Sequence, residues 1–330
     1  MPNLKTKYLG LDLKNPIIIA SSGLSDSVSN VTALEEAGAG AIVLKSLFEE
    51  EIVSEMETKL KQMASASFLY PETLEFYEDQ DEENMSIHYL ELIREAKSKV
   101  KIPVIASINC VTAEHWTYFP AQIELAGADA LELNVFLLPS DFNRNRVTNE
   151  KVYTDIIEKV CGIVKIPVAI KISSYFSDLA HTLQKFSQSA ISGLILFNKY
   201  YNPDFDIEKM EVTSGKVLSS PDDFHNTLRW ISILSGRVNC QLAASTGIHS
   251  GETAVKMILA GADVVQIAST VYQNGVGRIA EMIAFIQSWM DKKGFENLSD
   301  FRGKMSQAGS PNPAAYERVQ FMKYFKGYKK

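Results

Sequence analysis

Short apolar segments and longer amphipathic segments alternate along most of the chain. Three of the amphipathic segments end in Ala-Gly-Ala, and an apolar segment begins within two residues of each triplet. Glycine readily adopts the left-handed conformation that ends many helices, so each triplet predicts the end of a helix and the start of a strand. The apolar segments after the triplets are residues 41–46, 130–134 and 264–269. This recurrence predicts a repeated helix–strand unit.

Five more apolar segments extend the pattern. Lys-Ile-Pro-Val opens two of them, at Lys101 and Lys165, where a proline at a strand start costs no ladder hydrogen bond. The other three are residues 15–22, 193–198 and 241–246. Eight nearly continuous apolar strands alternating with helices predict a parallel, closed α/β fold, the (β/α)8 TIM barrel. A doubly wound open sheet is the alternative, but SSGLS follows the first strand instead of a Gly-x-Gly-x-x-Gly turn.

The helices between these strands have recognisable signals. Asn30 is a suitable N-cap for a helix over residues 31–37, and Ser250 for one over residues 251–260. A third helix presents an apolar stripe at helical spacing. The stripe consists of Val152, Ile156, Ile157, Val160 and Val164.

Three connections are longer than a barrel requires. Residues 47–100 form the longest, with an acidic part at residues 72–83 and a helical pattern in Ile87, Leu90, Ile93 and Ala96. The others are residues 135–149 and 199–224. Long connections at the C-terminal ends of barrel strands hold substrate loops, so we expect long loops at the mouth of the barrel. No linker divides the chain, which predicts one domain over residues 1–330 with an inserted excursion at about residues 47–100.

Composition narrows the partners. The chain has 33 basic and 40 acidic residues, a net charge of −7, which disfavours nucleic acid or an anionic membrane and favours a small-molecule ligand. No segment reaches the roughly 18 apolar residues of a membrane span. Cys110, Cys161 and Cys240 lack Cys-x-x-Cys spacing, so neither a disulfide framework nor a metal site is expected. Localisation in the cytoplasm follows as the expectation.

Polar residues gather where the apolar strands end. Two lysines, three asparagines and several serines occupy these positions, which form the reactive mouth of a barrel. They include Lys45, Ser46, Asn109, Asn134, Lys171 and Asn198. This set suits an anionic, amide-rich planar ligand. Thr246-Gly247-Ile248 and Ala268-Ser269-Thr270 follow the last two strands, where backbone N–H groups commonly bind phosphate.

Six motifs resemble those of the dihydroorotate dehydrogenases, most closely the soluble class 1 branch. They keep the family's order from about Leu9 to Gly275. The motifs are NPIIIASSG at residues 15–23, VLKS at 43–46, ALELN at 130–134, VAIK at 168–171, GLILFN at 193–198 and AGADVVQI at 260–267.

The resemblance implies an FMN-containing homodimer of the cytoplasm that oxidises dihydroorotate to orotate in pyrimidine biosynthesis, with hydride transfer to the flavin. By position, the residues implied at the isoalloxazine ring are Ala20, Ser21, Lys45, Ser46, Asn109, Asn134 and Lys171. Those implied at the phosphate are Gly247, Ile248, Ala268 and Ser269, and those at the substrate are Lys45, Asn134 and Asn198. Lys171 is implied as the cation that stabilises reduced flavin.

The chain departs from the family at the substrate. The family's catalytic cysteine corresponds to Leu137, which cannot accept a proton, and its substrate loop has no counterpart in residues 68–75. The catalytic base is therefore not identified from the sequence. The candidates are Cys110, Asp141, Tyr175 and Tyr200.

Several functions stay open at this point. One is a flavoprotein of the same fold that acts on a different cyclic amide or ene, and another is a non-catalytic flavin-binding homologue. A dihydrouridine synthase acting on tRNA is a third, although the acidic chain lacks a basic RNA-binding extension. A Schiff-base aldolase using Lys45 or Lys171 is the fourth.

Overall fold

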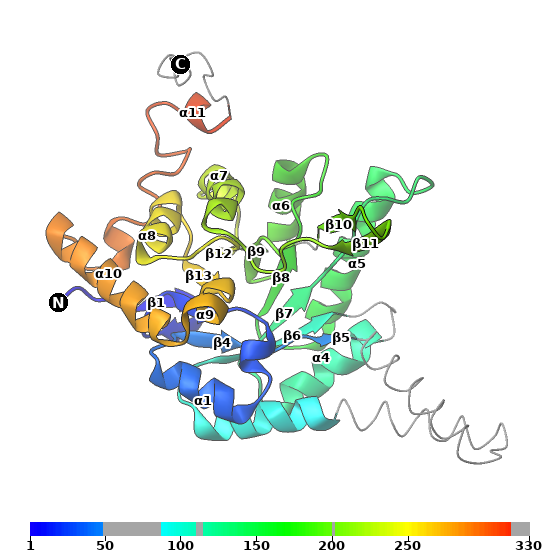
Figure 1. The fold of residues 1–330 in the computed structure, drawn as a ribbon, viewed down its shortest axis with the longest axis horizontal. Helices are drawn as coiled ribbons and strands as arrows, with labels where there is room; N and C mark the ends of the chain where they lie inside the picture. The colour runs from blue at the N-terminus through cyan, green and yellow to red at the C-terminus, as the bar shows by residue number, and fades with distance from the viewer. Residues whose placement is uncertain (49–86, 110–114, 200–201, 318–330) are drawn as a thin grey trace.

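The computed structural model of the chain describes residues 1–48, 87–109, 115–199 and 202–317 (Figure 1). In this part, eight parallel strands form a closed ring, because β4 pairs with β6 and β3 pairs with β13. In chain order they are β3 (Ile17–Ile19), β4 (Ala41–Val43), β6 (Val104–Asn109), β7 (Ala130–Asn134), β8 (Val168–Ile172), β9 (Gly193–Leu196), β12 (Gln241–Ser245) and β13 (Val264–Ile267). The predicted (β/α)8 barrel is confirmed.

Helices surround the ring in Figure 1 and pack their apolar faces against the outside of the strands. The larger ones are α1 (Val28–Glu36), a helix over residues 87–99, α4 (His115–Ala126), α5 (Arg146–Ile163), α6 (Leu179–Ser187), α7 (Phe224–Leu234), α8 (Gly251–Ala260) and α10 (Gly277–Lys293). Shorter elements are β5 (Leu47–Phe48), which pairs with β6, the 3-10 turns η1 (Gly23–Ser25), η2 (Pro221–Asp223) and η3 (Leu298–Asp300), and the helices α9 (Ser269–Asn274) and α11 (Ala314–Glu317).

The ends of the helices confirm most of the sequence signals. Gly38, Gly127 and Gly261 all have positive φ angles, of 107°, 94° and 122°. Ser250 caps α8 by accepting a hydrogen bond from the N–H of Thr253. In α5, Ile156, Ile157 and Val160 of the predicted stripe are buried.

The predicted cap of α1 is wrong. The helix begins at Val28, three residues before the predicted start, and its cap is Ser27, whose side chain accepts from the N–H of Asn30. The Asn30 side chain instead donates to Asp26 at 3.0 Å. Ser27 and Asn30 are both good capping residues, and the contact with Asp26 gives Asn30 a different partner.

A hairpin of β1 (Thr6–Tyr8) and β2 (Leu11–Leu13) closes the N-terminal end of the barrel. Tyr8, Leu9 and Leu13 are buried against side chains inside the ring, from Ile18 round to Val264. Gly193, the first residue of β9, allows this close contact, because a Cβ there would lie 2.7 Å from Leu9 Cδ2 and the Leu9 side chain would have to shift. The interior is therefore filled at this end, as expected for a packed barrel.

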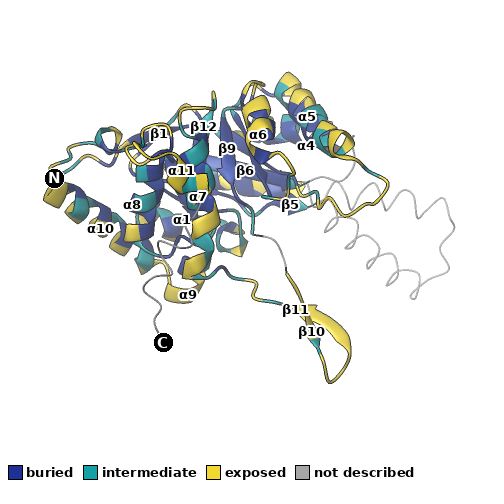
Figure 2. Ribbon diagram, turned by 90° about the horizontal axis from the view of Figure 1, so that it is seen from above, coloured by how far each residue is buried: buried dark blue, intermediate teal, exposed yellow. Residues whose placement is uncertain are grey.

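The long connection after β9 leaves the opposite end of the barrel. After β9, the strands β10 (Pro203–Asp206) and β11 (Glu211–Ser214) form an antiparallel hairpin that projects from the body of the molecule (Figure 2). Its apolar residues Phe205, Met210 and Val212 are exposed. The acidic residues 72–83 lie outside the described residues. No helix in the described part of the chain is long and apolar enough to cross a membrane.

Candidate functional site

Side chains alternate along a strand, so every second residue of each barrel strand points into the ring. In β7 and β8 this places Glu132 and Lys171 inside, one layer above the apolar floor made by Ala130 and Ala169. Other strands add polar side chains to the interior, and all of them are buried. The members of this polar layer are Ser107, Glu132, Lys171, Ser245 and Gln266.

Three members of the layer contact one another. Lys171 Nζ lies 3.4 Å from Glu132 Oε1 and donates to Gln266 Oε1, also at 3.4 Å. Gln266 Nε2 donates to Glu132 Oε2 at 2.7 Å. Neither Glu132 nor Gln266 is among the predicted site residues, although a charged residue inside an apolar strand is the signal that could have identified Glu132.

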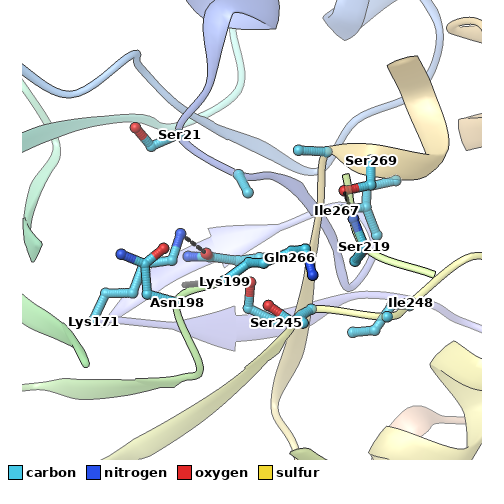
Figure 3. A pocket seen from close by; sticks show the side chains of 14 residues that line it. Ser21, Lys171, Asn198, Lys199, Ser219, Ser245, Ile248, Gln266, Ile267 and Ser269 are labelled. Atoms are coloured by element: carbon cyan, nitrogen blue, oxygen red, sulfur yellow. Dashed lines mark hydrogen bonds between the residues drawn. The ribbon is translucent and has the colours of Figure 1, made fainter. Parts of the chain in front are cut away.

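A cavity opens above this layer, where β3, β8, β9, β12 and β13 end (Figure 3). Eight predicted site residues line it. They are Ala20, Ser21, Lys171, Asn198, Gly247, Ile248, Ala268 and Ser269. The lining also includes Lys199, Ser219 and Ser245, which the sequence analysis does not name as binding residues. The structure therefore brings seven of the eleven predicted cofactor residues, from distant parts of the chain, to one cavity.

The remaining predicted residues stand at its edge or apart from it. Ser46 Oγ lies 2.9 Å from Ser21 Oγ and 2.7 Å from Ser107 Oγ, and it connects the rim to the polar layer. Asn134 Oδ1 accepts from Asn198 Nδ2 at 2.9 Å. Lys45 follows β4 and Asn109 ends β6, and neither lines the cavity.

The loop after β12 has an unusual backbone. Thr246 and Gly247 have φ angles of 76° and 77°, and the Thr246 hydroxyl donates to Phe197 O at 2.9 Å, which holds the non-glycine residue in this conformation. The N–H groups of Gly247, Ile248 and Ser269 make no hydrogen bond to any residue that the structure describes. Adjacent free amides of this kind bind anions with several acceptor oxygens, such as phosphate.

Charged residues lie next to this loop. Lys199 Nζ is 3.2 Å from Asp223 Oδ2, which also accepts from the Ser220 N–H at 2.9 Å. Burial acts to raise the pKa of Asp223, but these bonds from Ser220 and Lys199 bring it below its usual value. Burial lowers the pKa of His249, whose Nε2 lies 3.0 Å from Ser219 Oγ. His249 is therefore the neutral partner of Ser219 at pH 7.

Leu137 lies outside the Lys171 cavity. Its side chain packs against the apolar core and lines a second cavity of about 240 Å³ with Tyr153, Tyr175 and Phe176. Asp141 is exposed and accepts from the Asn143 N–H at 2.8 Å. Neither Asp141 nor Tyr175 lines the Lys171 cavity, and the other two candidate bases, Cys110 and Tyr200, lie outside the described residues.

The two other cysteines do not belong to the site. Burial raises the pKa of the Cys161 thiol to about 11 and that of the Cys240 thiol to about 12, so both are protonated at pH 7. Within the described ranges, no three or more His, Cys, Asp or Glu residues lie together as a metal site would require.

Fold and cavity together define a (β/α)8 barrel with a polar cavity at the C-terminal mouth. The family profile of dihydroorotate dehydrogenase matches residues 3–290. The chain therefore belongs to the dihydroorotate dehydrogenase family, a family of oxidoreductases.

Individual relatives are distant but match over their length. The catalytic subunit of dihydroorotate dehydrogenase B (NAD(+)) from Thermoplasma volcanium is 25% identical over 314 residues, covering 92% of this chain and 98% of the relative. Its counterpart from Thermoplasma acidophilum is 26% identical, covering 92% and 99%. A chloroplastic dihydropyrimidine dehydrogenase (NADP(+)) from Arabidopsis thaliana is 22% identical, covering 93% and 78%. Relatives named for two different dihydropyrimidine substrates thus align with most of this chain.

Proposed function

We propose that the protein is an FMN-dependent oxidoreductase that acts on a carbon–carbon bond of dihydroorotate or of a closely related cyclic amide. The observation that carries the proposal is the position of Lys171. Its buried ammonium lines the same cavity as the free amides of Gly247, Ile248 and Ser269. One cavity thus offers both a cation for a ring that becomes negative and donors for a phosphate.

The residues fit FMN on two further counts. The contacts of Lys171 with Glu132 and Gln266 are both 3.4 Å long, compared with about 2.7–2.9 Å for strong charged hydrogen bonds. The ammonium therefore retains capacity for another acceptor. At the other end, Lys199 adds a second cation near the Gly247 and Ile248 amides, which make no hydrogen bond within the described part of the chain. A ligand with an electron-rich edge and a phosphate satisfies both ends.

In this proposal each part of the chain has a separate task. Bound FMN supplies the hydride acceptor. The amides after β12 and β13 bind the phosphate, and Lys171 stabilises the negative charge that develops on the reduced ring. The hydrogen-bonded pair of Asn134 and Asn198 offers amide groups to a cyclic amide substrate. The filled barrel floor at Tyr8 and Leu9 excludes water from below.

The substrate is the less constrained part of the proposal. Leu137 replaces the cysteine that the family resemblance implies as the base, and it faces a different cavity. A cyclic amide other than dihydroorotate is therefore the second candidate, and the dihydropyrimidine dehydrogenase relative supports it. A Schiff-base reaction at Lys171 is disfavoured, because that reaction requires a free neutral amine whereas this ammonium is paired with Glu132.

Other features that the family resemblance implies remain predictions. They are a homodimer, a location in the cytoplasm and a role in pyrimidine biosynthesis. The single domain over residues 1–330, which is inferred from the absence of a linker, also remains a prediction.

The test is an anaerobic titration of the purified protein with dihydroorotate, followed through the visible absorbance of its flavin. Bleaching by dihydroorotate is the expected result, and dihydrouracil is the matched comparison without the carboxylate. Bleaching by dihydrouracil alone would transfer the assignment to the second candidate. A colourless protein that takes up no FMN on reconstitution would overturn the proposal.

A further inference from the structure

Glu132, Lys171 and Gln266 form a closed group at the bottom of the cavity. They come from β7, β8 and β13, and their exposed fractions are 1%, 5% and 1%. Figure 3 shows the contact between Lys171 and Gln266 at the cavity. Because Lys171 and Gln266 both line the cavity, the charge balance of this group acts directly on whatever binds above it.

The carboxylate of Glu132 is held in an asymmetric way. Its Oε2 accepts a short hydrogen bond of 2.7 Å from Gln266, whereas its Oε1 makes no hydrogen bond to any described residue and faces the Lys171 ammonium at 3.4 Å. The Gln266 amide donates to the carboxylate and accepts from the ammonium, so its two ends are assigned by their partners. Gln266 thus fixes the carboxylate at a set distance from the ammonium.

Stability alone does not account for this arrangement. A buried ion pair is often no more stable than apolar residues of similar volume, because both charges must leave water. Here the Lys171 ammonium lies 3.4 Å from both Glu132 Oε1 and Gln266 Oε1, and it borders a cavity. These features suit a lysine that contacts a ligand and whose positive charge is partly offset by a neighbouring carboxylate.

We infer that Glu132 is a positioning residue that, held by Gln266, offsets part of the Lys171 charge and thereby sets the reduction potential of the flavin. The inference rests on the proposed FMN function. A full positive charge beside the ring would stabilise the anionic reduced flavin strongly, and the nearby carboxylate reduces that effect. Removal of the Glu132 charge is expected to make the flavin easier to reduce.

The experiment measures the midpoint potential of the FMN-loaded protein by anaerobic dye-coupled reduction. Glu132→Gln is expected to shift the equilibrium toward reduced flavin about tenfold, a positive shift of about 30 mV for a two-electron couple. The exchange variant E132Q/Q266E is expected to return close to the wild-type value. In the wild type, the two oxygens that face Lys171 Nζ, Glu132 Oε1 and Gln266 Oε1, are equally distant at 3.4 Å, so the exchange keeps one carboxylate oxygen there.

Asp155→Asn is the control, because it removes a carboxylate that pairs with Lys151 on α5, outside the cavity. Its potential is expected to stay near that of the wild type. An unchanged potential in Glu132→Gln, or the same shift in both variants, would overturn the inference while the FMN function stands. If Glu132→Gln fails to fold, the exchange variant provides the test. A midpoint potential near the wild-type value supports the inference, and a shift of about tenfold in the flavin reduction equilibrium refutes it. Failure of the wild type to bind FMN would instead refute the proposed function.

Discussion

The two halves of the barrel mouth are built from different parts of the chain. On the side of β3, β12 and β13, the cavity is lined by residues at or just after the strand ends, such as Ser21, Ser245 and Ser269. On the side of β7 and β9, the site depends on long connections, with an exposed Asp141 and a projecting hairpin over β10 and β11. The motifs that resemble the family end at the barrel strands, whereas the departure at Leu137 lies in the connection after β7. Cofactor chemistry and substrate choice can therefore change separately.

Gly247→Ala is expected to have the largest effect, because it changes the half of the mouth formed by residues at or just after the ends of β3, β12 and β13. A Cβ at Gly247 would lie 2.2 Å from Phe224 N and 2.6 Å from Asp223 C, both backbone atoms that cannot move alone. We expect at least about a tenfold loss of FMN affinity, the equivalent of about 1.4 kcal/mol. Binding is measured by fluorescence titration of the apoprotein with FMN.

Gly236→Ala is the control for that variant. Gly236 has nearly the same φ, 76°, but nothing lies within 4 Å of its Cβ position. It is expected to cost only the strain of a left-handed residue, about 1–2 kcal/mol of unfolding free energy, with FMN affinity unchanged. Equal FMN affinities in the two variants would show that the loop after β12 does not bind the cofactor.

Leu137→Cys tests the loop-built half and should have a smaller effect. It restores a thiol at the family's catalytic position, but Leu137 lines the second cavity beside Tyr153 and Phe176. We expect no gain in the rate of flavin reduction by dihydroorotate and a loss of about 1–2 kcal/mol of unfolding free energy from lost packing. Stopped-flow absorbance and thermal unfolding measure the two quantities, and Leu137→Met is the volume-conserving control. A faster reduction in the cysteine variant alone would show that this loop delivers residue 137 to the flavin.

The smallest expected effect concerns pH. Because burial lowers the pKa of His249, the unfolded chain takes up a proton before the folded protein does as the pH falls below about 6.5. The contribution of His249 to stability is therefore complete above that pH and declines as the pH falls toward the folded pKa. His249→Gln should flatten the pH dependence of the melting temperature between pH 5 and about 6.5. The exposed His225, changed to Gln, controls for the loss of a histidine, and an equal flattening there would contradict the prediction.

The sequence predicts the barrel well because its signals are local. Each Ala-Gly-Ala triplet needs only a helix end beside a strand, and the positive φ angles of Gly38, Gly127 and Gly261 agree with it. The start of α1 was predicted less well, because Ser27 and Asn30 are comparable caps and the neighbouring Asp26 decides between them.

The sequence also predicts part of the site, namely the residues whose position depends only on where a strand ends. Residues at strand ends, such as Lys171 and Ser269, share the cavity because every parallel strand ends at the same mouth. The contact of Gln266 with Glu132 joins residues 134 positions apart, and only closure of the ring brings their strand faces together. The pairing of Lys199 with Asp223 depends on the path of the connection after β9, which no periodic pattern fixes.

Among the described residues, the hairpin of β1 and β2 closes the N-terminal end of the barrel, so the polar layer is reached from the mouth. Tyr8 and Leu9 fill the opposite end so closely that a Cβ on Gly193 would lie 2.7 Å from Leu9 Cδ2. Any molecule that reaches the polar layer must enter and depart by the same route. A molecule bound near the rim would block the exit of a molecule bound deeper. The molecule that binds first is therefore released last.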